Sequence, residues 1–457
     1  MRLKPCGDDQ SQGFLFDGTF GMVKKANRGN DRGMPELVWP SKSKQPLPGG
    51  TLVSDLIQDF NPAHNQDPVL ENRLILGDNL PVMSALLADF EERVDLIYVD
   101  PPFFTNKGYS TRVGRGEDSR KPEEWKLAEG YADEWDDLAS YLDMLYPRLL
   151  AMHRLLAPTG SLFLHLDWHA NAYARVLLDE IFGYDNLRNE IIWTYHGPSP
   201  IRSAFNRKHD MILFYSKTDQ YYFDPDPVRV PYASNTVNTF KSSSKAGFGK
   251  MPDLERGKVP EDWWYFPVVA RLHKERTGYP TQKPERLMER IILATTKPGD
   301  LVADFFCGAG TTGSVAARLG RRFILTDNQP RAVHTTRARL ILDQESEDPV
   351  KNTHSRIVFQ HEGGIKRAAP KTASDLGYSD PELEGGCIRL APKLAKQVLY
   401  WEIDPDYKGD IFRSRLSAAR PWRKGSLVRE LTLPDQTRRV WIRIVLINGE
   451  FLEQEIK

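Results

Sequence analysis

Residues 301–313 read LVADFFCGAGTTG, an apolar run that ends in a glycine-rich turn. The run predicts a buried β-strand, and Gly308, Gly310 and Gly313 match the GxGxxG pattern that leads from a strand into a helix. Asp327 ends the next apolar run, RFILTD (322–327). This order is typical of a site that binds a cofactor with a ribose: a strand, a glycine turn, a helix, and an acid after the next strand.

The acid ahead of the glycines separates two interpretations of this turn. An NAD-dependent oxidoreductase uses the same pattern and places a pyrophosphate over the helix N-terminus. Asp304 would repel a pyrophosphate there, but it suits the ammonium group of a methionine moiety. S-adenosylmethionine (AdoMet) carries that ammonium and a ribose that Asp327 can bind. AdoMet is favoured, and the oxidoreductase stays open as the alternative.

Apolar runs also alternate with segments of helical hydrophobic spacing on both sides of the turn. Five such runs, at 73–77, 94–100, 161–167, 190–195 and 211–217, are each expected to form a strand. With 301–307 and 322–327, the expected strands number seven. Strands that alternate with helices predict an α/β fold with a doubly wound, mostly parallel, seven-stranded sheet.

Composition divides the chain into six expected parts. These are an extended N-terminal arm (1–68), two halves of the α/β domain (69–195 and 281–345), an aromatic and basic region between them (196–280), a linker (346–370) and a small β-rich domain (371–457). Residues 209–217, near the start of the basic region, are left open as part of either that region or the sheet. The Gly- and Arg-rich residues 105–135 are expected to form a surface loop.

Bulk composition excludes several classes of protein. Hydrophobic residues make up 40% of the 457 residues and charged residues 27%, which is typical of a globular chain. No apolar run approaches the ~18–20 residues of a membrane span, and the polar start MRLKPCGDDQ lacks a secretory signal. Three distant cysteines predict neither disulfides nor a metal site. The expectation is a cytoplasmic protein without a metal.

Asp100-Pro101-Pro102-Phe103 follows the buried run VDLIYV, where doubly wound sheets place their ligands. The prolines remove two backbone donors, so the Asp100 carboxylate and the Pro101 carbonyl both act as acceptors, and Phe103 offers a stacking face. This set fits a planar ring that bears an amino group. Two acceptors on an NH2 group draw its lone pair out of conjugation, and the nitrogen can then attack a methyl group.

These motifs resemble those of the amino-group DNA methyltransferases. DPPF resembles their motif IV, and DFFCGAGTT (304–312) resembles their AdoMet motif. LILGDN (74–79) looks like the strand whose acid contacts the cofactor's adenine, and TQKPERLMERII (281–292) looks like motif X. The catalytic motif precedes the cofactor motif, which is the circularly permuted order of the β class. The resemblance includes adenine-specific members and type III modification subunits.

The resemblance implies a methyl transfer from AdoMet to adenine N6 in double-stranded DNA after base flipping. Asp at position 100 favours adenine, and cytosine N4 stays open, as does a DNA-binding protein with an inactive catalytic fold. The implied catalytic residues are Asp100, Pro101, Pro102 and Phe103. The implied cofactor-binding residues are Asp78, Thr281, Lys283, Asp304, Phe305, Gly308, Gly310, Thr311, Thr312 and Asp327.

The region 196–280 corresponds in position to the β-class target-recognition region. It holds 13 Lys and Arg against 9 Asp and Glu, interleaved with aromatic residues, which suits contacts to phosphates and base edges. The candidate DNA contacts are Arg202, Arg207, Lys241, Lys245 and Arg256. The expected partner is therefore double-stranded DNA. A homodimer or a separate restriction subunit is left open, and no membrane partner is expected.

Overall fold

A computed structural model gives the three-dimensional structure of the chain. It describes residues 14–16, 20–22, 35–42, 47–59, 71–113, 126–199, 201–242, 253–270, 273–344, 356–365, 370–422, 425–433 and 439–457. None of the helices within these ranges is both long enough and apolar enough to span a membrane.

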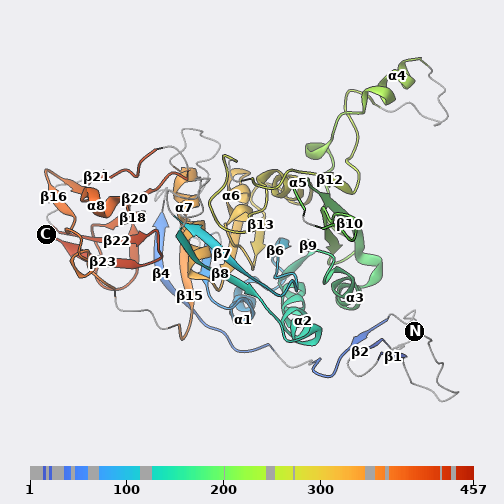
Figure 1. The fold of residues 1–457 in the computed structure, drawn as a ribbon, viewed down its shortest axis with the longest axis horizontal. Helices are drawn as coiled ribbons and strands as arrows, with labels where there is room; N and C mark the ends of the chain where they lie inside the picture. Colours follow the sequence, from blue (N-terminus) through green and yellow to red (C-terminus); the bar gives the residue numbers. More distant parts are fainter. Residues whose placement is uncertain are drawn as a thin grey trace.

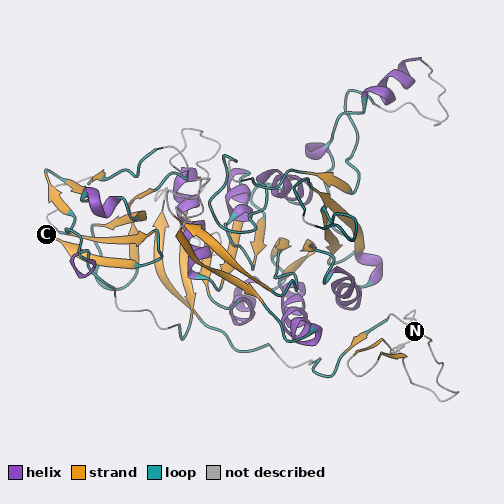
Figure 2. Cartoon of the chain, in the orientation of Figure 1, coloured by secondary structure: helices purple, strands orange, loops and turns teal. Residues whose placement is uncertain are grey.

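One large twisted sheet runs through the middle of the molecule, with helices on both of its faces (Figures 1 and 2). Its strand order is β12 (Trp263–Tyr265), β10 (Leu187–Thr194), β11 (His209–Ser216), β9 (Leu156–Leu166), β6 (Val94–Val99), β13 (Leu301–Asp304), β14 (Arg322–Asp327), β5 (Asn72–Leu76), β15 (Arg356–Glu362), β4 (Leu52–Asp59) and β19 (Phe412–Ser414). The strands from β9 to β15 are all parallel, whereas β11 is antiparallel to both of its neighbours.

The central strands are apolar on both faces because helices cover both faces. In β6, residues 97 and 99 pack with α1 (Asn79–Phe90), α2 (Leu138–Leu155) and α3 (Asn171–Phe182) in one buried cluster. Residues 96 and 98 point the other way, into a second cluster with α5 (Glu285–Thr295), α6 (Thr311–Arg318) and part of α7 (Pro330–Gln344). This arrangement confirms the doubly wound, mostly parallel α/β fold.

The sheet has eleven strands in the described part of the chain, four more than the sequence predicted. The seven predicted strands form a continuous run from β10 to β5. Strand β12 extends one edge, whereas β15, β4 and β19 extend the other. All four additions come from segments that were expected to lie outside the sheet, since β12 lies in the basic region, β15 in the linker, β4 in the N-terminal arm and β19 in the C-terminal domain.

The N-terminal arm predicted for 1–68 is wrong over part of its length. Strand β4 pairs with β15 from Leu52 to Asp59 and so belongs to the sheet. Next to the short strand β3 (Leu37–Val38), Trp39 is buried and donates from Nε1 to Asp143 of α2 at 2.6 Å. The many Gly, Pro and Lys residues of the arm obscured these two contributions to the core.

The linker predicted for 346–370 is also wrong where β15 lies. This strand fills the position between β5 and β4, with Ile357 and Val358 buried. Its sequence RIVFQHE is short and flanked by polar residues, so its apolar core carried little weight as a pattern. Pairing on both sides stabilises it as a strand.

The β-rich C-terminal part has a buried core of its own but is not separate from the sheet. It forms a four-stranded sheet in the order β20 (Leu416–Ala419), β18 (Val398–Asp404), β22 (Val440–Leu446), β23 (Phe451–Ile456), and a smaller one in the order β16 (Glu382–Glu384), β17 (Cys387–Arg389), β21 (Glu430–Thr432). Strand β19 leaves this unit and pairs with β4. The expectation of an independent small domain is therefore corrected.

Within the surface loop expected at 105–135, the described residues form two paired β-strands instead. Strands β7 (Lys107–Val113) and β8 (Lys126–Asp133) pair antiparallel, from Lys107 opposite Asp133 onward. This pair of strands crosses in front of the central sheet (Figure 1). The remaining described elements are β1 (Phe14–Phe16), β2 (Phe20–Met22), α4 (Ser234–Ser242), α8 (Pro392–Ala395) and 3-10 helices at Tyr184–Asn186, Asp226–Val228 and Ser374–Leu376.

A buried ion pair joins the C-terminal unit to the α/β body. Arg337 of α7 contacts Glu402 of β18 and Gln58 of β4, and its guanidinium lies 4.1 Å from the ring centroid of Phe359. Both partners of the ion pair are 2% exposed. Since neither charge reaches water, each depends on the other for its solvation.

We predict that Arg337→Met lowers the free energy of unfolding by about 3–5 kcal/mol, because it leaves the Glu402 carboxylate buried without its partner. Urea unfolding followed by circular dichroism measures this. The matched control is Arg389→Met, which breaks the half-exposed pair with Glu430 and is expected to leave stability nearly unchanged. Equal effects of the two substitutions would contradict the role given to Arg337.

Candidate active site

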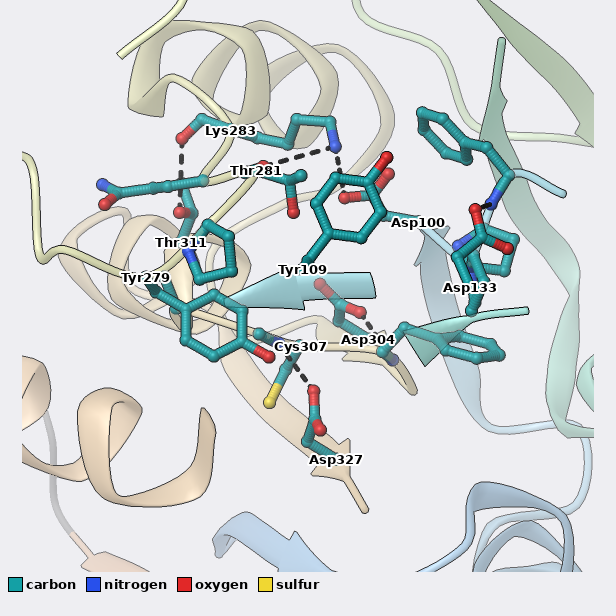
Figure 3. A pocket seen from close by; sticks show the side chains of 18 of the residues that line it. Asp100, Tyr109, Asp133, Tyr279, Thr281, Lys283, Asp304, Cys307, Thr311 and Asp327 are labelled. Atoms are coloured by element: carbon teal, nitrogen blue, oxygen red, sulfur yellow. Dashed lines mark hydrogen bonds and ion pairs between the residues drawn. The ribbon is translucent and has the colours of Figure 1, made fainter. Parts of the chain in front are cut away.

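A cavity of about 620 Å³ opens at the carboxyl ends of the central parallel strands (Figure 3). Strands β6 and β13 are parallel neighbours, with Asp304 opposite Tyr98, so residues 100 and 304 leave the sheet at the same edge. The cavity is lined by most of the predicted catalytic and cofactor residues, namely Asp78, Asp100, Pro101, Pro102, Phe103, Thr281, Lys283, Asp304, Phe305, Gly308, Thr311, Thr312 and Asp327. Such a volume suits a small-molecule cofactor.

Asp304 lies at the floor of the cavity and is 3% exposed. Its carboxylate accepts a hydrogen bond of 2.6 Å from the Thr312 hydroxyl and one of 3.0 Å from the Phe306 backbone N–H. Burial raises the pKa of Asp304 to about 7, and the carboxylates of Asp100 and Asp327 add to the rise. A buried acid in this state is poised to bind a cation.

The glycine turn is shaped by two residues with positive φ. Gly308 has φ of 50° and faces the ring of Tyr279, which a Cβ at 308 would approach to 3.1 Å. Gly310 has φ of 70°, and a Cβ there would lie 2.5 Å from Thr336. Gly310 does not line the cavity. Its cofactor contact stays a prediction, and the structure gives it a backbone role, because Thr336 of α7 fills the space beside it.

Asp327 closes the other side of the turn. Its carboxylate accepts hydrogen bonds of 2.9 Å from the backbone N–H groups of Gly308 and Gln329. Burial raises the pKa of Asp327 to about 6, although these backbone hydrogen bonds lower it. The carboxylate thus fixes the turn and still faces the cavity, where a ribose hydroxyl can donate to it.

Asp78 is engaged at the start of α1. It caps the helix by accepting from the Leu80 N–H at 2.9 Å and forms a 2.7 Å ion pair with Arg148 of α2. Its side chain is half exposed at the rim of the cavity. The neighbouring Asn79 is buried and donates to the Phe305 carbonyl at 2.8 Å, which connects α1 to the glycine turn.

Lys283 lies deeper than the cofactor wall predicted for it. Its ammonium is 2.5 Å from Oδ2 of Asp100 and 5.3 Å from the ring centroid of Phe103 (Figure 3). Oδ1 of Asp100 is buried and has no hydrogen-bond partner among the described residues. The cofactor contact of Lys283 stays a prediction, and the structure shows that Lys283 lines the cavity and holds one oxygen of the Asp100 carboxylate.

A buried network holds the Lys283 segment against the glycine turn. The Thr311 hydroxyl donates to the Lys283 carbonyl at 3.3 Å, and Arg339 donates to the Thr311 hydroxyl at 3.0 Å. Arg339 also pairs with Glu285 at the start of α5, at 2.6 Å. Burial would raise the pKa of Glu285, but Arg339 and Arg318 lower it overall. Lys283 and the glycine turn are thus positioned by one set of contacts.

Asp133, which the sequence analysis missed, holds the loop after Asp100-Pro101-Pro102 in place. It is 1% exposed and accepts hydrogen bonds from the backbone N–H groups of Phe103, Phe104 and Thr105 at 2.8–3.1 Å. It also accepts from the Thr105 hydroxyl and from Trp135 Nε1, both at 2.7 Å. Since Phe104 has φ of 65°, the backbone here is strained and depends on these bonds. A lone acid 30 residues away gave no sequence signal.

A second set of buried polar groups lies behind Phe103. His165 is fully buried, with Nδ1 at 2.7 Å from the Tyr98 hydroxyl and Nε2 at 3.3 Å from Asp210. Burial would raise the pKa of Asp210, but its hydrogen bond and charge interaction with His165 lower it overall. The His165 ring also stands 5.6 Å from that of Phe103 and 5.3 Å from that of Trp193. These groups support one wall of the cavity.

The five predicted DNA contacts are divided among several places. Arg202 is exposed, and the guanidinium of Arg207 lies 4.2 Å from the ring centroid of Trp168. Arg256 forms a 2.7 Å ion pair with Asp226, so part of its charge is already compensated. Lys245 and the side chain of Lys241 lie outside the described residues. Lys241 belongs to α4, which projects away from the body (Figure 1).

The family model described as DNA methylase matches residues 94–338, just over half of the chain. The chain belongs to this family. It is 34% identical to the type II methyltransferase M.BglII of Bacillus subtilis over 55% of its own length and 64% of that protein. It is 30% identical to the DNA adenine methyltransferase YhdJ of Escherichia coli (strain K12) over 55% of its length and 76% of that protein. A solved M1.HpyAVI–SAM complex aligns with a TM-score of 0.39 and 19% identity over 59% of this chain and 98% of that one.

Family membership decides between the two interpretations of the glycine turn. The predicted methyltransferase is confirmed, with AdoMet as its cofactor, and the NAD-dependent oxidoreductase is wrong. The donor set fits AdoMet, because the buried Asp304 carboxylate can neutralise an ammonium and Asp327 can accept from a ribose. The aromatic Phe305 and the rim acid Asp78 line the same cavity.

We predict that Asp133→Ala lowers kcat by about 10²-fold or more while AdoMet affinity changes little, because a small misplacement of the Asp100 loop costs that much. Single-turnover methylation and calorimetric AdoMet binding separate the two effects. The control is Asp136→Ala, which removes an exposed acid from the same segment. Loss of AdoMet binding in Asp133→Ala would show that the acid supports the whole site and not the loop alone.

We predict that AdoMet affinity rises with pH between 5.5 and about 7, because the cation binds the ionised form of Asp304, whose pKa is about 7. Asp304→Asn should weaken binding and flatten this pH dependence, as measured by calorimetry. The folded-state pKa lies above the usual value of 3.8, so ionisation of Asp304 costs stability as the pH rises through this window. The free Asp304→Asn variant should therefore melt at a higher temperature at pH 7.5. An unchanged slope of affinity with pH would contradict this role for Asp304.

Proposed function

We propose that this DNA methyltransferase acts on adenine N6 in double-stranded DNA after extruding the base. The observation that carries the proposal is Oδ1 of Asp100, a buried carboxylate oxygen at the cavity that accepts no hydrogen bond from any described residue. A buried acceptor without a donor is costly, and the amino group of a bound base would satisfy it.

The residues around Asp100 have different roles in holding the amino group of the base. Lys283 holds Oδ2 at 2.5 Å, which leaves Oδ1 for the amino group. The Pro101 carbonyl is the second acceptor, because the Pro102 carbonyl is already bound by the Tyr141 hydroxyl at 2.9 Å. Two acceptors draw the nitrogen lone pair out of conjugation, and Asp100 then accepts the proton that the amine loses. Bound AdoMet supplies the methyl group.

Aromatic residues favour a planar base as the substrate. Phe103 offers a ring face beside Asp100, and Trp193 and Tyr195 line the same cavity. Oδ1 of Asp100 is buried in the cavity, where a base that stays stacked in a duplex cannot reach it. The position of this oxygen therefore supports the proposal that the target base is extruded.

Adenine is favoured over cytosine as the target. An acid at position 100 supports this choice, as does the name of the adenine methyltransferase to which the chain is 30% identical. We further propose that 196–280 recognises the DNA sequence. The homodimer and the restriction subunit stay predictions.

The experiment is sequencing and mass spectrometry of DNA from a host that expresses the chain. N6-methyladenine within one sequence context is the expected result, and the context supplies the substrate for every later assay. N4-methylcytosine would replace the proposed base, and unmodified DNA together with inactive purified protein would favour the inactive-fold alternative.

We predict that Asp100→Ala lowers the rate of methyl transfer by about 10²–10⁴-fold, because it removes the group that holds and deprotonates the amine. AdoMet affinity should change by less than about tenfold, since the cofactor's ammonium is assigned to Asp304. Single-turnover kinetics and calorimetry measure the two quantities. The exposed Asp185→Ala is the matched control. A larger loss of AdoMet affinity in Asp100→Ala would place Asp100 in the cofactor site.

Recognition by 196–280 is tested by substitution and not by truncation. Deletion of 371–457 would remove β19 from the sheet and the partners of Arg337 and of Asp55. The cleaner comparison pairs Arg202→Ala with Arg389→Ala, an exposed arginine of the C-terminal unit. Only the first should weaken binding to DNA.

A further inference from the structure

The loop between β10 and β11 is long and stands at the active-site edge of the sheet. The two strands are antiparallel neighbours, with Thr194 opposite His209, and 14 residues (195–208) connect them. Hairpin connections usually need about 2–5 residues, and longer ones are commonly functional. Both ends of the loop adjoin the cavity, because Tyr195 and Asp210 line it.

The described part of this loop is held in a defined shape. The Tyr195 N–H donates to the Lys208 carbonyl at 3.1 Å, and the Lys208 ammonium donates to the Pro198 carbonyl at 3.0 Å. Arg202 donates to the Ser199 carbonyl at 3.1 Å. Arg207 stacks on Trp168, which follows the cavity residue Asp167 at the end of β9. These contacts fix both sides of the short segment 203–206.

Phe205 occupies that segment and is 97% exposed. Among the large hydrophobic residues in the described ranges, the next most exposed is Trp263 at 60%. An aromatic ring with almost no protein contact gains nothing from folding, so its position suggests a contact outside the protein. The loop carries Arg202, Arg207 and Lys208 and no acid, and this charge matches a phosphate backbone.

We propose that Phe205 is a wedge that enters the DNA duplex and fills the space left by the extruded base. This inference rests on the proposed function, and it assigns a role to a residue that does not line the cavity. Apolar side chains inserted between base steps are a known means of unstacking a duplex. The flanking cations would bind the phosphates on either side, while the target base enters the cavity beside Asp100.

The test compares two duplexes that carry the methylated sequence found in host DNA. One is fully paired, and the other has an abasic site opposite the target adenine, so its target is already unpaired and costs less to extrude. Single-turnover rates are measured with saturating AdoMet for the wild type, Phe205→Ala and Phe205→Trp. The control is Phe223→Ala. Phe223 is partly exposed, follows the end of β11 that is farther from the loop, and stacks on Phe214 within that strand.

Phe205→Ala should slow methylation of the paired duplex by roughly tenfold to a hundredfold, the loss expected for one aromatic–base stack. On the abasic duplex the loss should be less than about threefold, and Phe205→Trp should retain most activity on both. Fluorescence of 2-aminopurine at the target position should rise on binding of the wild type and less on binding of Phe205→Ala. Phe223→Ala should match the wild type throughout.

Two results would overturn the wedge. One is an unchanged rate on the paired duplex, and the other is an equal loss on both duplexes, which would mean that the ring contacts the extruded base or serves binding in general. Retained AdoMet binding in Phe205→Ala shows that the variant is folded. Failure of the proposed function looks different, because the wild type itself would then leave both duplexes unmethylated.

Discussion

Strands β6 and β13 lie side by side and parallel, and this adjacency places two acids at one edge of the sheet. Asp100 and Asp304 are 204 positions apart in the chain, yet they line one cavity together with Asp327. Burial raises the pKa of Asp304 to about 7, and the charges of Asp100 and Asp327 add to the rise. Such a site gains from binding a cation, which is what the ammonium and sulfonium of AdoMet provide. Lys283 compensates the charge of Asp100.

The rest of the site maintains this arrangement without touching the reacting atoms. Asp133 binds three consecutive N–H groups of the loop after Pro102, so the paired strands β7 and β8 determine where Phe103 lies. Arg339 and Thr311 connect the glycine turn to the segment that carries Lys283. The catalytic and cofactor halves, which are separated by 196–280 in sequence, are thereby held in register. The strained backbone at Phe104 is retained because buried hydrogen bonds offset its cost.

The edge of the sheet farthest from β12 is completed by the ends of the chain. Strand β4 comes from the N-terminal segment, β19 from the C-terminal unit, and β15 fills the place between β5 and β4. Arg337 with Glu402, and Arg443 with Asp55, connect the C-terminal unit to this edge. An exposed edge strand would otherwise be open to pairing with other chains. The C-terminal unit is therefore part of the folded body.

The sequence by itself predicted the seven central strands, their mostly parallel arrangement and most of the motif residues that line the cavity, because each depends on a continuous stretch of the chain. Buried runs such as VDLIYV and the spacing of the glycines around 308–313 depend only on neighbours in the chain. Tertiary structure alone decided the roles of Asp133, His165 and Lys283, since their partners lie 28 to 183 positions away. It also decided the membership of β4, β15 and β19 in the sheet. A short polar strand becomes stable only when both of its edges find partners, and no local pattern records those partners.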